Sequence, residues 1–312
     1  VPIAMTSTSN QLDELATQGV TILHRVFTDK DLAPIIEDIE IWINQRAKTL
    51  HERGKIAHLH EGEPFERRYA NLFSQSKSMS KGLDVMYMLS PGIFEFLLDN
   101  PLLDILEAVL GPDISCNPIQ HLRAKPPTKL EGGNEPSFHN VPWHQDAGVM
   151  MAEADGSNIL TCWIPLVHVT DSMGPMRAIP NCIGKGYLSH IEAAETMIDP
   201  PVGEELLTAQ SPIKLTCKKG DVVLMNRFTP HSSTPNNSDI CRWSLDLRYQ
   251  TTGHHTGRTA HPAFQVRSAE QTVFETYANW KSRWEDAFKN PHGFAGHRIH
   301  QRQVKKSVWR FE

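Results

Sequence analysis

Residues 220–249, GDVVLMNRFTPHSSTPNNSDICRWSLDLRY, decide the predicted fold of this 312-residue chain. Gly220 and Asp221 form a turn, and the apolar run VVLM that follows them is typical of a buried strand. The polar stretch TPNNSD is a second turn, and it leads into the alternating run RWSLDLRYQ of another strand. Short strands joined by turn residues in this way indicate an antiparallel β-sandwich or barrel.

Strand-like runs of the same kind occur earlier in the chain. NILTCWIPLVHV (residues 158–169) and PIKLTC (residues 212–217) are short, contain β-branched residues and are bounded by turn-forming residues. We therefore predict a β core at about residues 114–250.

Before this core, over about residues 9–112, the pattern changes to that of helices. TDKDLAPIIEDIEIWINQRAKTL begins with a capping-box pattern, Thr28 and Asp31, and continues with apolar side chains at helical spacing. PLLDILEAVLGP predicts a shorter helix that ends at its glycine and proline. An amphipathic helix is predicted after the core, at about residues 268–289. No change of composition marks a boundary, so we predict a single domain over residues 1–312, of the α+β class with a mainly β core.

The composition is that of an ordinary soluble globular protein, with 39% hydrophobic and 21% charged residues. The net charge is −5 and no run of Lys and Arg dominates, so nucleic acid is not an expected partner. No apolar run reaches the ~20 residues that span a bilayer, so no membrane is expected either. The first residues lack a signal-peptide pattern, and the five cysteines are widely spaced without a CxxC motif. We therefore expect a cytoplasmic protein without disulfide bonds or a cysteine zinc site.

The sequence WHQD at residues 143–146 contains a histidine and an aspartate two positions apart. On an extended strand, side chains at positions i and i+2 point to the same face, so His144 and Asp146 can reach one metal ion. Two histidines and a carboxylate form the facial triad of non-haem Fe(II) enzymes, which leaves coordination positions open. Because this short pattern is common by chance, a loop histidine with a local hydrogen bond is the alternative interpretation.

Residues 220–249 supply the missing third ligand. His231 follows the predicted strand VVLM, and Arg242 begins the next strand. A buried arginine is costly unless it meets an anion, and its guanidinium group fits a carboxylate with two parallel hydrogen bonds. We therefore predict a metal triad of His144, Asp146 and His231 beside an arginine, Arg242, that binds an acid.

The combined pattern, WHQD followed by GPM and then by residues 220–249, resembles the phytanoyl-CoA dioxygenase family of Fe(II)/2-oxoglutarate-dependent oxygenases. The resemblance covers roughly residues 114–249 and includes the spacing between His231 and Arg242. It implies a double-stranded β-helix, the jelly roll of cupin-like proteins, with supporting helices chiefly on the N-terminal side and a C-terminal helix. It also implies that Fe(II) is the cofactor and that 2-oxoglutarate and O2 are cosubstrates.

The resemblance implies roles for individual residues. The triad would bind Fe(II), and 2-oxoglutarate would be held by Arg242, Ser233 and Gln120. Trp163 matches an aromatic residue that lines the family's pocket; a place in the plain core is its other interpretation. Asp146 indicates hydroxylation, because related halogenases have a small residue at this position. Residues 180–183 read PNCI where the family often has Pro-Gly-Ser-His, so no substrate is carried over from the best-known members.

Other residues near these motifs have two interpretations. Arg123 and Lys125 follow Gln120 on one predicted strand, and they either face the pocket, where they would bind an acidic substrate, or lie on a solvated face. Met150 is predicted to form an adaptable apolar wall of the substrate pocket. Arg248 is expected to be paired on the outside of the barrel.

Three histidines outside the triad are alternative metal ligands: His139, His254 and His255. Adjacent side chains rarely face the same way, so His254 and His255 are expected on a surface loop or at the pocket lip. Within WHQD, Gln145 is expected to point away from the metal and to tolerate substitution. Trp143 is expected to pack in the β core.

These features predict a 2-oxoglutarate-dependent dioxygenase that hydroxylates, or otherwise oxidises, an unactivated C–H bond of a small molecule. The alternative is a non-redox cupin-like metal enzyme, a hydrolase or isomerase, which would use the same triad without needing Arg242. The sequence leaves open the identity of the substrate and the oligomeric state, monomer or homodimer.

Overall fold

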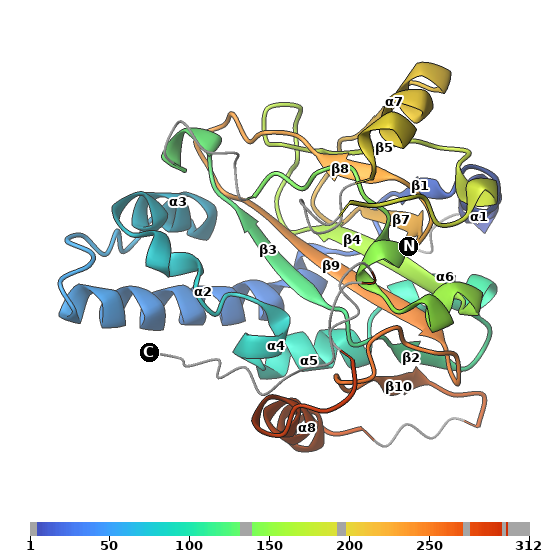
Figure 1. Ribbon diagram of the computed structural model, residues 1–312. Coiled ribbons are helices and arrows are strands. Elements are labelled where there is room, and N and C mark those ends of the chain that lie inside the picture. Colours follow the sequence, from blue (N-terminus) through green and yellow to red (C-terminus); the bar gives the residue numbers. More distant parts are fainter. Residues whose placement is uncertain (1–4, 132–138, 192–197, 271–274, 295–297, 299–312) are drawn as a thin grey trace.

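The computed structural model describes residues 5–131, 139–191, 198–270, 275–294 and 298 (Figure 1). Its α-helices are α1 (Met5–Gln18), α2 (Asp29–Glu52), α3 (Phe65–Gln75), α4 (Val85–Met88), α5 (Pro91–Leu98), α6 (Leu102–Leu110), α7 (Pro200–Ala209) and α8 (Tyr277–Lys289). Its strands are β1 (Val20–Leu23), β2 (Ile114–Cys116), β3 (His121–Lys125), β4 (Ile159–Pro165), β5 (Met176–Ala178), β6 (Ile213–Leu215), β7 (Val222–Asn226), β8 (His231–Ser233), β9 (Arg242–Thr251) and β10 (Phe264–Arg267). Short 3₁₀ helices are η1 (Lys77–Ser80), η2 (Thr128–Leu130), η3 (Asp146–Val149), η4 (Ala152–Gly156) and η5 (Ile183–Lys185).

The strands form two antiparallel sheets. The larger has seven strands in the order β1-β7-β4-β9-β2-β10, with β3 also paired to β9. The smaller has three strands in the order β6-β5-β8. The α+β class and the mainly β core are therefore confirmed, and the two strands predicted within residues 220–249 are β7 and β9.

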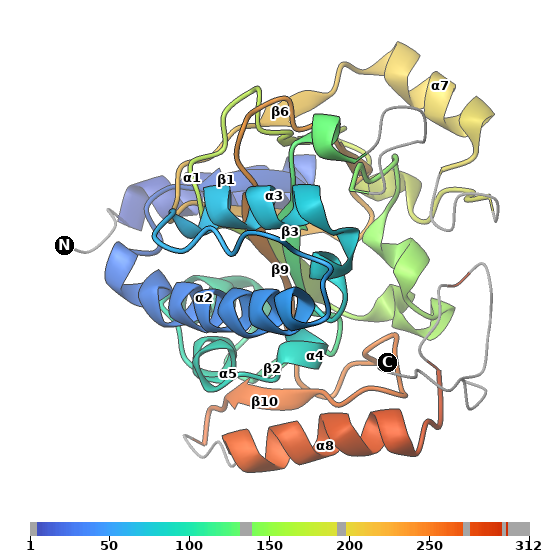
Figure 2. The same cartoon turned by 90° about the vertical axis from the view of Figure 1, so that its left-hand side faces the viewer.

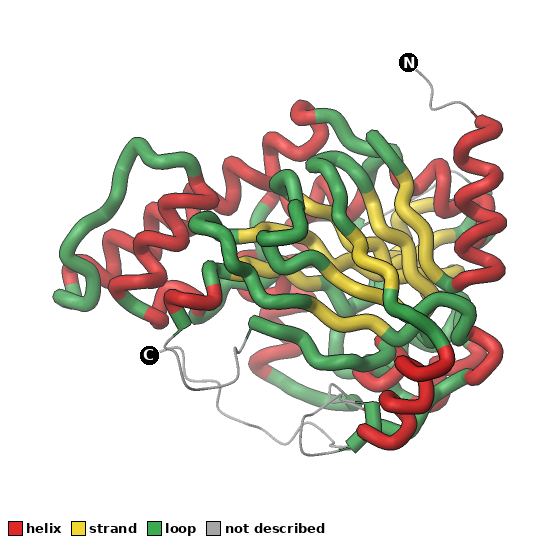
Figure 3. Tube along the Cα trace, turned by 90° about the horizontal axis from the view of Figure 1, so that it is seen from above, coloured by secondary structure: helices red, strands yellow, loops and turns green. Residues whose placement is uncertain are grey.

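Most helices come from the N-terminal part and cover the large sheet. In Figures 1 and 2, α2, α4 and α5 lie on one side of β3 and β9, and α7 lies on the opposite side of the molecule. Figure 3 shows the strands grouped at the centre with helices around them. Helix α2 begins at the predicted capping box, in which the Thr28 side chain accepts a hydrogen bond from Asp31 N. Its predicted apolar stripe faces the core, and its fully buried members include Leu32, Ile35 and Ile39.

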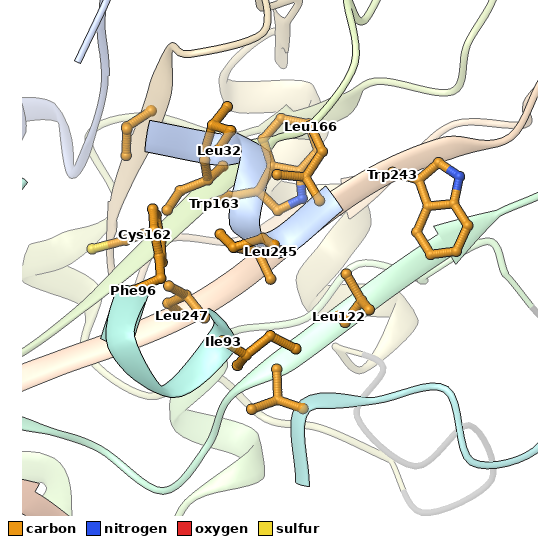
Figure 4. Close-up of a cluster of buried hydrophobic side chains, with 14 of the residues drawn as sticks. Leu32, Ile93, Phe96, Leu122, Cys162, Trp163, Leu166, Trp243, Leu245 and Leu247 are labelled. Atoms are coloured by element: carbon orange, nitrogen blue, oxygen red, sulfur yellow. The ribbon is translucent and has the colours of Figure 1, made fainter. Parts of the chain in front are cut away.

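Strand β9 divides its side chains between two environments, because successive residues of a strand point to opposite faces. Trp243 packs on Tyr69 of α3 with ring centroids 4.9 Å apart. Leu245 and Leu247, two and four positions later, belong to the same buried cluster of apolar side chains (Figure 4). The intervening residues face the interior of the β core, where Arg242, Asp246 and Arg248 line a cavity. One face of β9 therefore anchors the helices and the other builds the site.

The C-terminal helix begins later than predicted. Residues 264–267 form β10, which pairs with β2, and Thr276 caps α8 by accepting a hydrogen bond from Asn279 N. Part of the predicted helix, residues 271–274, falls outside the described residues. Trp280 of α8 is buried against Phe94 of α5, with ring centroids 5.4 Å apart.

One buried apolar cluster joins the N-terminal helices, the strands and α8, from Leu15 to Trp284. On this basis we propose that the chain is a single domain. All five cysteines are buried and unpaired. Within the residues that the structure describes, none of the helices is both long enough and apolar enough to cross a membrane.

Candidate metal centre and acid-binding pocket

His144, Asp146 and His231 come together inside the β core. His144 and His231 face each other across an isolated antiparallel bridge: each backbone N–H donates to the other's carbonyl, at 3.0 and 2.9 Å. Their ring centroids are 4.1 Å apart, and Nε2 of each ring lies 3.9 Å from Oδ1 of Asp146. One potential ligand atom from each of the three residues lies within 4.8 Å of the others, so one metal ion can reach all three.

Backbone carbonyls orient both histidine rings. Nδ1 of His144 lies 2.9 Å from the carbonyl of Pro142, and Nδ1 of His231 lies 3.0 Å from the carbonyl of Thr229. A carbonyl only accepts, so Nδ1 carries the hydrogen and Nε2 keeps its lone pair for a metal. Burial lowers the pKa of His144 to about 3, with a further contribution from His231. His144 is therefore neutral at physiological pH, as a metal ligand must be.

Both carboxylate oxygens of Asp146 accept hydrogen bonds. Arg248 Nη2 donates to Oδ1 at 2.7 Å, and the hydroxyl of Thr161 donates to Oδ2. Burial alone would raise the pKa of Asp146, but the charge of Arg248, the two histidines and the hydrogen bond from Thr161 together outweigh burial and hold this pKa well below its usual range. The carboxylate is therefore ionised and fixed in orientation. The triad thus offers two neutral imidazole nitrogens and one carboxylate oxygen, the donor set that suits non-haem Fe(II).

Arg248 was expected outside the barrel, and the structure shows that this expectation is wrong. Its side chain is only 3% exposed. The reason is the two-residue period of β9: Arg248 shares the inward face with Arg242 and Asp246. Asp246 Oδ1 lies 3.6 Å from the same guanidinium nitrogen that contacts Asp146.

A second group of polar side chains lies in the same cavity. Lys125 of β3 pairs directly opposite Arg242 of β9, and Lys125 Nζ donates to the hydroxyl of Ser233 at 2.9 Å. Lys125 is 1% exposed and Arg242 is 5% exposed. Like charges opposite each other on neighbouring strands are destabilising. Over the described ranges, neither cation forms a salt bridge with a carboxylate.

Burial, together with the nearby charge of Arg242, lowers the pKa of Lys125 to about 6. Burial also lowers the pKa of Arg242 to about 10. Arg242 Nε is buried without a hydrogen-bond partner among the described residues, and the same holds for the hydroxyl of Ser232, which also lines the cavity. Buried donors without partners are rare in proteins, and an anion in this pocket would satisfy them. The pocket therefore fits the carboxylate of 2-oxoglutarate.

One cavity of about 210 Å³ connects the triad and the two cations. Trp163, which was expected to line the pocket, does so, and the Arg242 guanidinium lies 5.2 Å from the centroid of its ring. Arg123 also lines the cavity, on the same face of β3 as Lys125. Apolar walls come from Val141, Val149, Met176 and Met225.

Two predicted pocket residues are not brought to this cavity. Gln120 is buried in the wall: its Nε2 donates to the carbonyl of Arg248 at 2.7 Å, and its Oε1 accepts from Arg248 N at 3.1 Å. These contacts use the amide that was expected to meet 2-oxoglutarate. Met150 is fully buried in a small cluster with Ile119 and Ile159 rather than in the pocket wall; its neighbour Val149 lines the cavity instead.

The two remaining residues of WHQD differ from expectation. Gln145 does point away from the metal centre, but it is 0% exposed. Its Nε2 donates to the carbonyls of Gly186 and Phe228 at 2.9 and 2.6 Å, and its Oε1 accepts from Leu188 N at 2.8 Å. These contacts argue against the predicted tolerance to substitution, which stays a prediction to be tested. Trp143 is half-buried against a separate cluster that includes Ile179 and not in the main β core.

The alternative histidines have other contacts. His139 lines the cavity, but its Nδ1 contacts the carboxylate of Glu131. Nδ1 of His254 accepts from Asn158 N at 2.9 Å, and Nδ1 of His255 accepts from Gly257 N at 3.0 Å. The adjacent pair therefore stabilises loop backbone, in line with the expected loop position.

Known proteins share this architecture. A family model described as phytanoyl-CoA dioxygenase (PhyH) matches residues 16–244. No curated protein sequence matches the chain. Similar solved structures include the non-heme monooxygenase ThoJ in its apo form, with a TM-score of 0.55 and 16% identity over 89% of this chain and 98% of that chain.

Two further similar structures were solved with ligands. The epimerase SnoN, in complex with Fe3+, alpha ketoglutarate and nogalamycin RO, has a TM-score of 0.54 and 13% identity over 81% of this chain and 88% of its own. EctD from S. alaskensis, with 2-oxoglutarate and 5-hydroxyectoine, has a TM-score of 0.52 and 17% identity over 81% of this chain and 78% of its own. At such identities these structures show a shared fold, and they confirm the predicted jelly roll. Because the family model matches most of the chain, including the whole triad and Arg242, the chain belongs to the phytanoyl-CoA dioxygenase family, whose members depend on Fe(II) and 2-oxoglutarate.

Proposed function

We propose that this protein is an Fe(II)- and 2-oxoglutarate-dependent dioxygenase that hydroxylates an unactivated C–H bond of a small molecule. The observation that carries the proposal is the pair Lys125 and Arg242, two buried basic side chains without a salt bridge to a carboxylate in the described residues, in the cavity of the triad. A non-redox hydrolase or isomerase with the same triad has no need for such a pair. A cosubstrate with two carboxylates explains the pair, since one carboxylate can contact Lys125 and Arg242 while the opposite end of the molecule reaches the metal.

Each group in the cavity then has a role. His144, Asp146 and His231 would hold Fe(II), and Arg242, Lys125 and Ser233 would hold the distal carboxylate of 2-oxoglutarate. When bound, Fe(II) and 2-oxoglutarate together reduce O2 and supply the oxidant for the C–H bond, with release of succinate and CO2.

The surrounding side chains would position these groups and exclude water. Arg248 and Thr161 hold the two oxygens of Asp146, so the carboxylate cannot rotate freely toward the cavity. Trp163 lies against Arg242 and limits the orientation of its guanidinium plane. The apolar walls formed by Met176 and Met225 reduce access of water to the reacting centre.

The size of the cavity, which also has to hold part of 2-oxoglutarate, supports a small substrate. Its volume of about 210 Å³ is below the roughly 300–1,000 Å³ of pockets that enclose drug-sized ligands. The ligands in similar structures, nogalamycin RO in SnoN and 5-hydroxyectoine in EctD, are also small molecules. This similarity supports the substrate class proposed for this chain.

The test uses purified protein with Fe(II), ascorbate, 2-oxoglutarate and O2, and measures succinate release over a panel of small molecules. Under anaerobic conditions, 2-oxoglutarate should produce the metal-to-ligand charge-transfer absorption of this class. If neither succinate nor the absorption is observed, the proposal fails. The mass of the product tests the reaction itself: hydroxylation adds one oxygen atom, whereas an epimerisation such as that named for SnoN leaves the mass unchanged.

A further inference from the structure

Arg123 lies on the inner face of β3, between His121 and Lys125 at alternate positions of the strand. In the pairing with β9, Arg123 lies opposite Ser244. The pairs Lys125–Arg242 and His121–Asp246 lie two residues away on either side of it. Its side chain lines the cavity and is also exposed. Arg123 therefore stands where the cavity opens to solvent.

No hydrogen bond or salt bridge engages the Arg123 guanidinium within the part of the chain that the structure describes. The acids on neighbouring elements have other partners. Asp84 accepts from Leu122 N at 2.8 Å and lies 2.8 Å from Nδ1 of His121. Asp246 lies 3.6 Å from Arg248. An inward-facing arginine is thus left without a carboxylate in direct contact; its attraction to Asp84 acts over a longer distance.

The side chains that line the cavity carry more positive than negative charge. Four basic side chains line it, Arg123, Lys125, Arg242 and Arg248, against two carboxylates, Asp146 and Asp246. Two further carboxylates lie outside this lining: Glu131 interacts with His139 and Lys125, and Asp84 interacts with Arg123. The count that follows covers the lining residues alone. Burial lowers the pKa of His121 and of His139, so these two cavity histidines add no charge at physiological pH. The two positive charges of Fe(II) and the two negative charges of 2-oxoglutarate cancel. With Lys125 protonated beside 2-oxoglutarate, the loaded cavity retains two positive charges.

Arg258 adds to the positive potential on this side of the cavity. It is 8% exposed, and its Nε donates to the carbonyl of Val149, a residue of the cavity wall, at 3.1 Å. Burial lowers the pKa of Arg258 to about 10, and repulsion from Arg248 and Arg123 contributes to this shift. A potential of one sign at the opening of a low-dielectric cavity concentrates ligands of the opposite charge.

We propose that the substrate carries an anionic group, a carboxylate or a phosphate, and that Arg123 binds this group at the opening of the cavity. The inference rests on the proposed function, because 2-oxoglutarate must occupy Lys125 and Arg242 for Arg123 to be left to the substrate. A guanidinium group presents two parallel N–H donors, which match either anion in a bidentate contact. Arg123 is thus a specificity-determining residue, and the reacting carbon of the substrate lies between its anionic group and the metal.

The test measures binding of matched pairs to protein loaded with Mn(II) and 2-oxoglutarate in the absence of O2. The pairs are 3-phenylpropanoate with its methyl ester, N-acetylleucine with its methyl ester, and phenyl phosphate with phenol. At least one anion should bind at least about tenfold more tightly than its neutral partner, as expected for a charge-assisted contact. The ester pairs and the phosphate pair show which of the two anions is preferred.

Arg123→Gln should remove this tenfold preference, and Arg123→Lys should retain part of it because the charge remains without the fork. Arg53→Gln is the matched control: it removes the same charge from an exposed position after α2, and it should preserve the preference. All variants should bind 2-oxoglutarate within about twofold of wild type, since Lys125 and Arg242 are unchanged.

The outcomes separate this inference from the proposed function. If the wild-type protein does not bind 2-oxoglutarate, the proposed function fails and the inference fails with it. If 2-oxoglutarate binds but no anion of the panel binds more tightly than its neutral partner, the inference alone is overturned. The same conclusion follows if Arg123→Gln and Arg53→Gln behave alike.

Discussion

Arg248 donates a hydrogen bond of 2.7 Å to Oδ1 of Asp146, the same oxygen that lies 3.9 Å from Nε2 of both candidate histidine ligands. Both partners of this salt bridge are buried. The carboxylate of the metal centre is therefore compensated by a cation before any metal binds. The cation comes from β9, the strand that also carries Arg242, so the metal centre and the acid-binding pocket share one rigid element.

Replacing Arg248 by methionine should weaken binding of Mn(II) by about 10–100-fold, because Asp146 loses the donor that orients it. In the metal-free protein the free energy of unfolding should fall by roughly 3–5 kcal/mol, since the variant leaves a buried carboxylate without a partner. Calorimetric titration and urea unfolding measure the two effects. Arg248→Lys keeps the charge and should show smaller losses. A folded Arg248→Met protein with wild-type affinity for Mn(II) would contradict the orienting role.

Replacing Lys125 by methionine should stabilise the protein in the absence of ligands, by on the order of 1 kcal/mol at neutral pH, because the Lys125 amine has to lose its proton to be buried beside Arg242. The pH dependence has a definite sign. The pKa of Lys125 is about 6 in the folded protein and that of lysine is about 10.4 in an unfolded chain. Between these values the unfolded state binds the extra proton, so this residue makes the free energy of unfolding rise with pH. Urea unfolding at several pH values should show that rise in wild type and lose it in Lys125→Met.

Binding of 2-oxoglutarate should be coupled to protonation of Lys125. The bound carboxylate favours the charged amine, so binding above the folded pKa of about 6 takes up a proton and weakens as the pH rises. Calorimetry of the Mn(II)-loaded protein in two buffers with different ionisation enthalpies measures the uptake, which should approach one proton per 2-oxoglutarate. Lys125→Met should abolish it. Equal uptake in the variant would assign the proton to another group.

Arg242→Ala and His144→Ala should separate the two parts of the cavity. Loss of Arg242 should raise the Kd of 2-oxoglutarate by about 30-fold or more, the usual effect of removing one partner of a buried charge pair. The affinity of the Arg242→Ala protein for Mn(II) should stay near that of wild type, because Arg242 does not contact the triad. His144→Ala removes a metal ligand and should therefore weaken binding of both Mn(II) and 2-oxoglutarate. If Arg242→Ala binds 2-oxoglutarate as tightly as wild type, the acid-binding pocket has been assigned to the wrong residues.

Gln145→Ala should lower the free energy of unfolding by roughly 2–4 kcal/mol, because one buried and two partly buried backbone groups lose their hydrogen-bond partners. Gln45→Ala, at an exposed position of α2, is the matched control and should change the free energy of unfolding by less than about 0.5 kcal/mol. Urea unfolding provides both values. Similar small effects in the two variants would restore the view that Gln145 tolerates substitution.

The sequence predicted those parts of the fold that depend on local patterns. The capping box at Thr28 and the alternation of residues in β9 are properties of neighbouring residues, and both were confirmed. Strand β10 was not predictable in the same way. It depends on the pairing with β2, and those two strands are far apart in the chain.

The same distinction holds for the site. Residue type and spacing suffice to select His144, Asp146, His231 and Arg242. The place of Lys125 opposite Arg242 depends on the register between β3 and β9, which a sequence pattern does not contain. Arg248 was within reach of prediction, because the two-residue period that places Arg242 inside also places position 248 inside. Its closest partner, Asp146, lies 102 residues away along the chain, so the sequence pattern does not show that contact. The contacts of Gln145 come from loops about 40 and 80 residues away along the chain.

The alternation of β9 limits how this enzyme can diverge. Insertion or deletion of a single residue within the strand would exchange its two faces, placing arginines among the helices and tryptophan and leucines against the metal centre. The strand can therefore accept substitutions but no change of length. Changes in length that adapt the enzyme to new substrates therefore have to occur outside β9. Strand β3 reaches the opening of the cavity at Arg123, so substitutions there can change substrate binding directly.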